Sequence, residues 1–349
     1  MSDVTLDGDE VLLVASRGIE DRHGLWLWRL RDGQWQGRQV DAVQQLSALT
    51  GHPSLPVVYG TAGIGQEGSL HAWRIDASGE ASLSEGSSGG ADPCHLEVDP
   101  SGRVLIATNY ASGTLALQRL DARGAFAGSP LLLKLSGSGP ETDRQDDAHP
   151  HQAFFIGGTL VVIDLGADRI REFALDPEAD DAGLITEIRA TAVPPGTGPR
   201  HGVVLPDGRL AVSGELGENL VVGRLGAAPE QWANVRGTRL SGPAKTRWER
   251  NYPGDIRSSP DGRYVYFANR SYDSLATFDV GGPAPILVSE LDTGVHWPQH
   301  ILVRPGHVLV AGWDSARVVA MPLEAGIPQG VETLFDCDGA GWLHPHKLA

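Results

Sequence analysis

Cysteines, long apolar runs and basic leader segments are scarce in this sequence. Its 349 residues include only Cys94 and Cys337, too few for a disulfide framework and typical of a reducing compartment. No apolar stretch approaches the roughly 18 residues that a transmembrane helix needs. The first ten residues, MSDVTLDGDE, lack the basic and apolar regions of a secretory signal. We therefore expect a cytoplasmic protein that does not enter a membrane.

Basic residues are also scarce relative to acidic ones. The chain has 28 Lys and Arg against 44 Asp and Glu, with a formal net charge of −16 at pH 7. Such a charge disfavours nucleic acid or an anionic membrane as a partner. It leaves room for a small anionic substrate, because a local basic pocket can lie within an acidic protein. An apolar content of 41% is enough for a sizeable core, and we expect one domain over residues 1–349.

No amphipathic helix is evident, and alternating strands recur instead. The repeated unit is a strand, a Pro-Asp-Gly or Pro-Ser-Gly turn, a returning apolar strand and a further alternating strand. Its copies cover residues 11–30, 54–75, 94–120, 151–175, 201–225, 256–280 and 300–323. Seven copies predict an all-β, seven-bladed β-propeller of four-stranded antiparallel blades. The first copy lacks its opening strand, so we expect the C-terminal GWLHPHKLA to supply that strand and close the ring, as a monomer.

The hairpin GPRHGVVLPDGRLAVSGEL, residues 198–216, carries Arg200 and Glu215 at its open end. When the blades are aligned on their turns, other polar residues take equivalent places. Cys94, His151, Arg200 and Gln299 precede the inner strands, followed by His95, Gln152, His201 and His300. The second strands end at Asn109-Tyr110, Asp164-Leu165, Gly214-Glu215, Asn269-Arg270 and Gly312-Trp313. Because both strands meet at one face, these residues are predicted to surround one mouth of the central channel.

Several phrases resemble a known family. They are DPCHLEVDPSGRVLIATNYASGTLAL, RQDDAHPHQ, VVIDLGADRI, GPRHGVVLPDGRL followed by GEL, and SPDGRYVYFANR. Together they are similar to the seven-bladed lactonase family, which includes propeller-type 6-phosphogluconolactonases and fungal carboxy-cis,cis-muconate cyclases. The resemblance implies a catalytic group of His151, Arg200, Glu215 and Arg270. One departure is Ile156-Gly157-Gly158, where the family has Pro-Asp-Gly.

Each of these residues also has a structural interpretation. Arg200 with Glu215 is either half of an active site or a surface ion pair, and His151 alone is typical of a structural histidine. Two arginines beside one glutamate leave a surplus positive charge that suits an anion or an oxyanion. Six further residues are predicted to bind substrate: His95, Asn109, Asp164, His201, His300 and Trp313. For Asn109 and Asp164, the alternative is that they cap strand ends.

Two long connections, residues 136–150 and 239–255, are expected to lie over the same mouth. The second holds Lys245, Arg247 and Arg250, the most basic stretch of the chain. It is a candidate clamp for a substrate phosphate or, alternatively, a solvated loop.

The sequence therefore predicts a lactonase that acts on a small anionic sugar lactone of the 6-phosphogluconolactone kind. In this hypothesis Glu215 is the general base, Arg200 and Arg270 hold an anionic group or the oxyanion, and His151 protonates the leaving ring oxygen. We expect no metal and no organic cofactor, since carboxylates flanked by arginines disfavour a hard cation. Two alternatives stay open: a muconate-type cyclase acting on a diacid, and a non-catalytic propeller that binds a metabolite or a protein.

Overall fold

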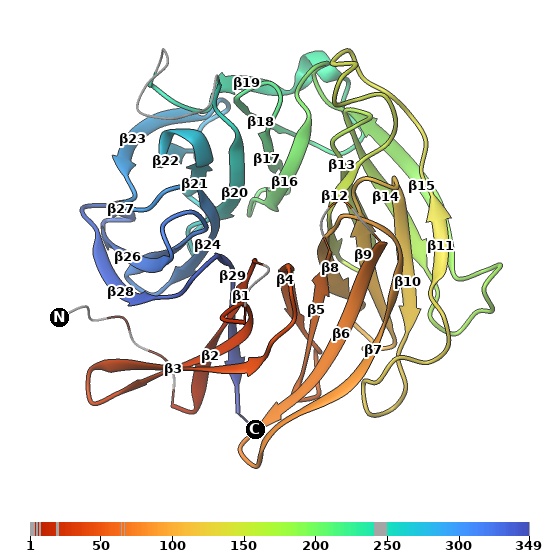
Figure 1. Ribbon diagram of the computed structural model, residues 1–349. Helices are drawn as coiled ribbons and strands as arrows, with labels where there is room; N and C mark the ends of the chain where they lie inside the picture. The colour runs from red at the N-terminus through yellow and green to blue at the C-terminus, as the bar shows by residue number, and fades with distance from the viewer. Residues whose placement is uncertain are drawn as a thin grey trace.

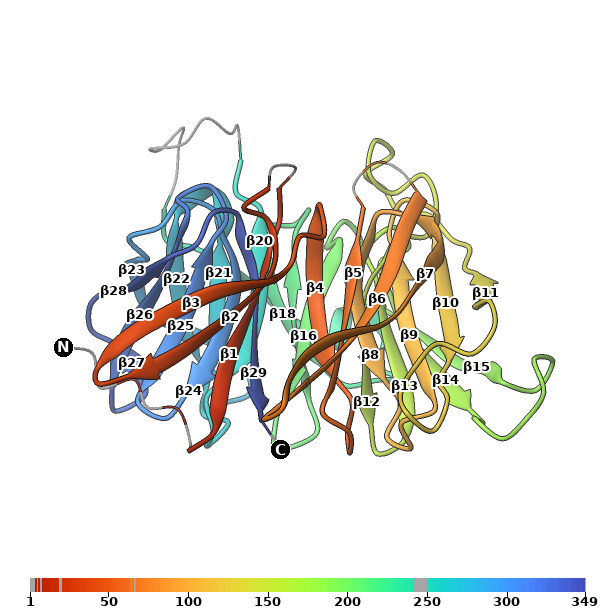
Figure 2. The same ribbon diagram turned by 60° about the horizontal axis from the view of Figure 1, so that its bottom comes forward.

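Seven antiparallel sheets are arranged as blades around a central channel (Figure 1). The computed structural model describes residues 4, 6, 8–18, 21–63, 65, 67–240 and 250–348. The innermost strands of neighbouring blades contact one another in an unbroken circle. Figure 2 shows these strands running through the thickness of the ring, so that each end of the channel is surrounded by strand ends. The predicted seven-bladed propeller is confirmed.

Each blade has four main strands, ordered from the channel outward. Blade 1 contains β29 (Ala340–Lys347), β1 (Glu10–Ser16), β2 (Gly24–Arg31) and β3 (Gln34–Asp41). Blade 2 contains β4 (Leu46–Gly51), β5 (Val57–Ala62), β6 (Glu67–Asp76) and β7 (Gly79–Ala91). Blade 3 contains β8 (Pro93–Val98), β9 (Val104–Asn109), β10 (Thr114–Arg119) and β11 (Leu131–Lys134). Blade 4 contains β12 (Pro150–Ile156), β13 (Thr159–Asp164), β14 (Arg169–Leu175) and β15 (Ile185–Ala192).

The remaining blades follow the same order. Blade 5 contains β16 (Pro199–Val204), β17 (Leu210–Gly214), β18 (Asn219–Gly223) and β19 (Ala233–Arg236). Blade 6 contains β20 (Pro253–Ser258), β21 (Tyr264–Asn269), β22 (Ser274–Asp279) and β23 (Ile286–Asp292). Blade 7 contains β24 (Pro298–Arg304), β25 (His307–Gly312), β26 (Arg317–Glu324) and β28 (Glu332–Asp336), with the short β27 (Ile327–Pro328) also paired to β26. Two 3-10 turns, η1 (Pro229–Gln231) and η2 (Arg270–Tyr272), complete the described elements, and no described helix is long and apolar enough to cross a membrane.

The ring closes between the two ends of the chain. Strand β29 pairs antiparallel with β1, from Glu10 opposite Lys347 to Ser16 opposite Ala340. Its side chains Trp342 and Leu343 are buried. The C-terminal segment is thus the inner strand of blade 1, as the sequence predicted from the missing strand of the first copy.

A one-residue β-bulge recurs near the start of the inner strands. In blade 5, Pro199 is opposite Gly214 and His201 is opposite Ser213, so that Arg200 is the extra residue. The same register shift isolates Ser47, Cys94, His151 and Gln299 in four other blades. A bulge leaves one residue outside the ladder and re-aims its side chain. In five of the seven blades, the fold therefore presents one side chain at the mouth from the same position.

The turn after β12 is shorter than the turns that follow β8, β16 and β20. Ile156 pairs with Thr159, which leaves only Gly157 and Gly158 between the strands. Their φ angles are +54° and +88°, the left-handed region that a two-residue hairpin turn requires and that glycine adopts without a Cβ clash. The departure from the family's Pro-Asp-Gly is thus a tighter turn on the same hairpin, and His151 keeps its place at the mouth.

Candidate functional site

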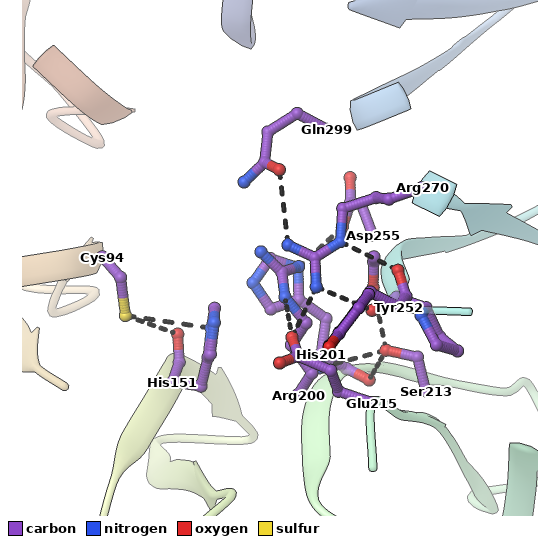
Figure 3. A network of polar contacts seen from close by, with 12 residues as sticks. Cys94, His151, Arg200, His201, Ser213, Glu215, Tyr252, Asp255, Arg270 and Gln299 are labelled. Carbon is purple, nitrogen blue, oxygen red and sulfur yellow. Dashed lines mark hydrogen bonds and ion pairs between the residues drawn. The ribbon is translucent and has the colours of Figure 1, made fainter. Parts of the chain in front are cut away.

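One mouth of the channel holds a cavity of about 210 Å³. Its lining comes from all seven blades and from the connection before blade 4. The lining residues are Arg17, Ser47, Asp92, Pro93, Cys94, Tyr110, Arg144, His151, Arg200, His201, Glu215, Arg270, Gln299 and Trp342. All four residues of the predicted catalytic group are among them. Figure 3 shows Cys94 and His151 on one side of the space and Arg200, Glu215 and Arg270 on the other.

The centre of the site is the Glu215 carboxylate, which is contacted by three guanidinium groups. Arg144 Nη2 donates to Glu215 Oε1 at 2.8 Å, and Arg270 Nη2 donates to Oε2 at 2.5 Å. Arg200 Nε lies 3.2 Å from Oε2. Glu215, Arg200 and Arg270 are each exposed by less than 9%. Three positive charges on one buried carboxylate leave a surplus of positive charge facing the cavity.

Strand ends hold this cluster in place. Glu215 follows β17, and its backbone N–H donates to Gly198 O at 2.9 Å. Arg270 follows β21 in the next blade, and its Nε donates to Tyr252 O at 2.9 Å. The guanidinium of Arg270 also lies 5.0 Å from the ring centroid of Trp297, a cation–π distance. Equivalent positions in adjacent blades therefore bring the two charged groups together.

The arginines set the protonation state of Glu215. Burial alone raises the pKa of its carboxyl, but the charges of Arg270, Arg200 and Arg144 outweigh burial and hold that pKa far below the usual range. Glu215 is ionised at neutral pH as a result. Both of its carboxylate oxygens are contacted by guanidinium groups, so Glu215 holds the three arginines in place.

His151 faces the cluster as a neutral imidazole. Burial lowers its pKa well below 6.5, and the charge of Arg200 lowers it further. Its Nδ1 lies 3.8 Å from Cys94 Sγ, and its ring packs edge-on against Tyr110 and His201 with centroids 5.6 and 5.1 Å apart. A neutral imidazole beside a cationic surface has a lone pair to accept a proton.

His201 is bound to a buried carboxylate behind the cavity. Its Nδ1 lies 2.8 Å from Asp255 Oδ1, and Asp255 also pairs with Arg257 Nη1 at 2.9 Å. Burial lowers the pKa of His201 well below 6.5, so the ring is neutral and donates from Nδ1. Its Nε2 is buried and has no hydrogen-bond partner among the described residues. His201, oriented by Asp255, therefore has its Nε2 available as a hydrogen-bond acceptor in the cavity wall.

Of the six predicted substrate-binding residues, only His201 lines this cavity. His95 and His300 line a second cavity of about 270 Å³ that follows the inner strands away from the mouth, together with Glu97 and Arg257. The reason is the bulge: the residue after it returns to the ladder and faces the deeper channel, while the bulged residue reaches the mouth.

Asn109, Asp164 and Trp313 lie outside both cavity linings. Asn109 is fully buried and donates to Ser88 O and Thr114 Oγ1, both at 3.0 Å. Asp164 is fully buried and accepts from His149 N at 2.8 Å and Arg171 Nε at 2.9 Å. These contacts fit the alternative interpretation, that the two side chains cap strand ends, and substrate binding by Asn109 and Asp164 stays a prediction. Trp313 is covered by the guanidinium of Arg17, 4.4 Å from a ring centroid.

Two arginines of the site were not predicted from the sequence. Arg144 comes from residues 136–150, which lie over the mouth as expected, but no repeat position marks it. Arg17 directly follows β1 and is the equivalent of Glu215 in blade 1. Aligning the incomplete first copy with the others was the signal that could have found it.

The basic stretch before blade 6 does not supply a cavity residue within the described part of the chain. Lys245 and Arg247 lie outside the described residues. Arg250 donates to Leu216 O, pairs with Glu218 at 3.6 Å, and is not a lining residue. Among the described residues, no group of three or more His, Cys, Asp or Glu is placed to hold a metal ion.

Comparison with known proteins places these observations in a family. A family model described as "Lactonase, 7-bladed beta-propeller" matches residues 13–326. A 6-phosphogluconolactonase of Formosa agariphila is 28% identical over 80% of this chain and 82% of its own length. A 6-phosphogluconolactonase of Bacillus subtilis is 27% identical over 79% and 81%.

Solved structures share the fold. The periplasmic gluconolactonase of Pseudomonas aeruginosa has a TM-score of 0.80 and 21% identity, with 97% of this chain and 99% of that chain covered. A protein from Lactobacillus plantarum has a TM-score of 0.83 and 22% identity, with 97% and 99% covered. The family match spans most of the chain and includes every blade, so the protein belongs to the seven-bladed β-propeller lactonase family.

Proposed function

We propose that the protein hydrolyses a sugar lactone of the 6-phosphogluconolactone kind without a metal ion. The observation that carries the proposal is the pairing of a surplus of buried arginine charge around Glu215 with a neutral imidazole, His151, on the opposite side of one small cavity. Hydrolysis of an ester needs both: cations for the oxyanion and a base for water. The names of the relatives from Formosa agariphila and Bacillus subtilis support the same substrate class.

Arg200 and Arg270 are assigned to the developing negative charge. Arg200 Nη1 is buried and has no hydrogen-bond partner among the described residues. Its Nε is within ion-pair distance of Glu215, but that contact lacks hydrogen-bond geometry. Arg200 therefore has donors available for a carbonyl oxygen as it becomes an oxyanion, and such preorganised donors contribute about 3 kcal/mol each in acyl-transfer sites.

His151 is assigned to proton transfer in place of Glu215. It accepts a proton from the attacking water as the new carbon–oxygen bond forms, which yields a tetrahedral intermediate and an imidazolium. The intermediate then expels the ring oxygen, the ring C–O bond breaks, and the imidazolium returns the proton to that oxygen. Glu215 stays ionised and orients the three arginines, because both of its carboxylate oxygens are engaged by Arg144, Arg200 and Arg270. The products are a hydroxyl and a carboxylic acid.

The test is an assay panel with purified protein. The substrates are 6-phosphogluconolactone, unphosphorylated gluconolactone and carboxymuconate, each with and without a chelator, and with His151→Gln as the variant. We expect turnover of the sugar lactones, no effect of the chelator, and a loss of at least about 100-fold in kcat for His151→Gln. Turnover of carboxymuconate alone would favour the cyclase, and binding without turnover of any substrate would favour a non-catalytic propeller.

We further propose that the protein works as a monomer in the cytoplasm. The closed ring leaves no unpaired inner strand among the described blades, and both cysteines are free, as a reducing compartment favours. Size-exclusion chromatography with light scattering and fractionation of cells test the two parts separately.

A further inference from the structure

Arg17 is a fourth arginine in the lactonase cavity, and it stands apart from the cluster at Glu215. It follows β1 in blade 1, whereas Glu215 follows β17 in blade 5. Going through blades 7 and 6, these positions are three blades apart, the largest separation that a ring of seven allows. Arg17 therefore lies across the mouth from the group that we assign to the ester carbonyl.

The guanidinium of Arg17 is held in place by stacking on a tryptophan. It lies over the ring of Trp313, 4.4 Å from a ring centroid, and its backbone N–H donates to Gly339 O at 2.7 Å. Its Nε is buried and has no hydrogen-bond partner among the described residues. Burial lowers the pKa of Arg17 by more than the charge of Asp92 raises it. The resulting pKa of about 10 still leaves Arg17 charged at neutral pH.

Asp92 is the other acidic residue of the cavity lining, and its carboxylate accepts a hydrogen bond from the backbone. Its Oδ1 accepts from the backbone N–H of Gly65. The lining thus has four arginines against two carboxylates, with His151 and His201 neutral. A formal surplus of two positive charges remains. A phosphate monoester carries between about −1.5 and −2 at pH 7, which matches that surplus.

A partly buried cation with a buried Nε that has no hydrogen-bond partner among the described residues is costly unless a ligand supplies its partner. We propose that Arg17 forms the phosphate subsite of this enzyme and binds the terminal phosphate monoester of a lactone whose ring ester lies at Arg200 and Arg270. The placement suits a substrate that carries its ester at one end and its phosphate at the other. This inference rests on the proposed function, since it takes the ester end of the substrate to be at the Glu215 cluster.

Trp313 acts as the support of this subsite. Stacking on an indole fixes the plane of the guanidinium before the ligand arrives, so less side-chain freedom is lost on binding. Trp313 thus contributes through Arg17 and not through contact with the cavity.

The experiment measures kcat/KM for 6-phosphogluconolactone and for gluconolactone with wild type, Arg17→Gln and Arg17→Lys. We expect the ratio of the two values to fall by roughly 10- to 100-fold in Arg17→Gln, the range for one lost charge-assisted contact, and to fall less in Arg17→Lys. Arg22→Gln is the control, because Arg22 is 77% exposed and pairs with Asp338 at 3.5 Å, outside the cavity. An unchanged ratio in folded Arg17→Gln overturns the subsite.

A binding measurement separates this inference from the proposed function. Titration calorimetry with 6-phosphogluconate and with gluconate needs no turnover. Tighter binding of 6-phosphogluconate that Arg17→Gln abolishes supports the subsite even if no lactone is hydrolysed, in which case only the proposed function fails. Equal affinity of wild type for the two acids, or equal weakening of both by Arg17→Gln, contradicts the subsite whether or not lactones are hydrolysed. Thermal melting curves confirm that each variant is folded.

Discussion

Arg270 and Glu215 occupy equivalent positions in adjacent blades, each directly after the second strand, and Arg270 Nη2 donates to Glu215 Oε2 at 2.5 Å. The repeat of the fold thus produces a buried ion pair between blades 5 and 6 at the channel mouth. Arg144 completes it from outside the repeat, with Nη2 2.8 Å from Glu215 Oε1 and 2.9 Å from Tyr110 Oη.

Replacing Glu215 with Gln should cost both activity and stability. The variant keeps the shape of the side chain but leaves three guanidinium groups without their counter-charge, two of them fully buried. We expect a loss of at least about 100-fold in turnover, because the arginines are no longer oriented, and a fall of about 3–5 kcal/mol in the free energy of unfolding.

Urea denaturation and the lactone assay check this pair of effects. Glu218→Gln is the matched control, since Glu218 is partly exposed and pairs with Arg250 at 3.6 Å. This variant should lower the free energy of unfolding by no more than about 1 kcal/mol. A Glu215→Gln protein with normal turnover would remove Glu215 from the functional group.

Acid should destabilise the protein through its buried histidines. Burial lowers the pKa of His95 to about 3 and those of His151, His201 and His300 well below 6.5. In the unfolded chain these groups titrate near 6.5, so below that pH the unfolded state binds protons that the folded state does not. Their contribution to stability is present above about pH 6.5 and is lost as the pH falls towards the folded-state values.

Each histidine should change the free energy of unfolding by up to about 1.4 kcal/mol per pH unit. Urea denaturation between pH 7.5 and 5 measures this pH dependence of the free energy of unfolding. The variant His300→Gln should show a smaller pH dependence, reduced by the contribution of one histidine. A free energy of unfolding that stays level down to pH 5 would contradict the neutral, buried state of these rings.

Cys94 should be a slow nucleophile despite its place in the cavity. Burial raises the pKa of its thiol to about 11, so the thiolate, the reactive form, is rare at neutral pH. We expect slow alkylation by iodoacetamide at pH 7.5, faster alkylation as the pH rises, and Cys94→Ala activity within a few-fold of wild type. Peptide mass mapping distinguishes Cys94 from Cys337, and rapid labelling at neutral pH would show that the thiol is activated.

Removing residues 340–349 should prevent the ring from closing. The deletion takes away β29, which is the inner strand of blade 1 and carries the buried Trp342 and Leu343. We expect loss of the cooperative thermal transition, followed by circular dichroism, and aggregation on size-exclusion chromatography, because β1 is left with an exposed edge. Lys347→Ala, at the exposed end of β29, should behave as wild type.

Much of the site was predictable because the fold repeats. The Pro-Asp-Gly turns mark where each inner hairpin reverses, so Arg200, Glu215, Arg270 and His151 were placed at one mouth from spacing alone. The same alignment put His95 and His300 beside them, but one residue along a strand changes the direction of a side chain. The bulge sends the preceding residue to the mouth and these two into the deeper channel.

The number of blades, the strand that closes the ring and the residues that end strands at the mouth could all be read from the sequence. Alternating patterns and turns are local signals, and they recur along the chain. The folded ring was needed to show that Arg144 reaches Glu215, that Asn109 and Asp164 are buried in contacts with neighbouring strands and loops, and that Arg17 lines the same cavity from blade 1. These relationships join residues from different blades and loops. They depend on how the ring closes and which charges burial brings together, and no local pattern encodes either.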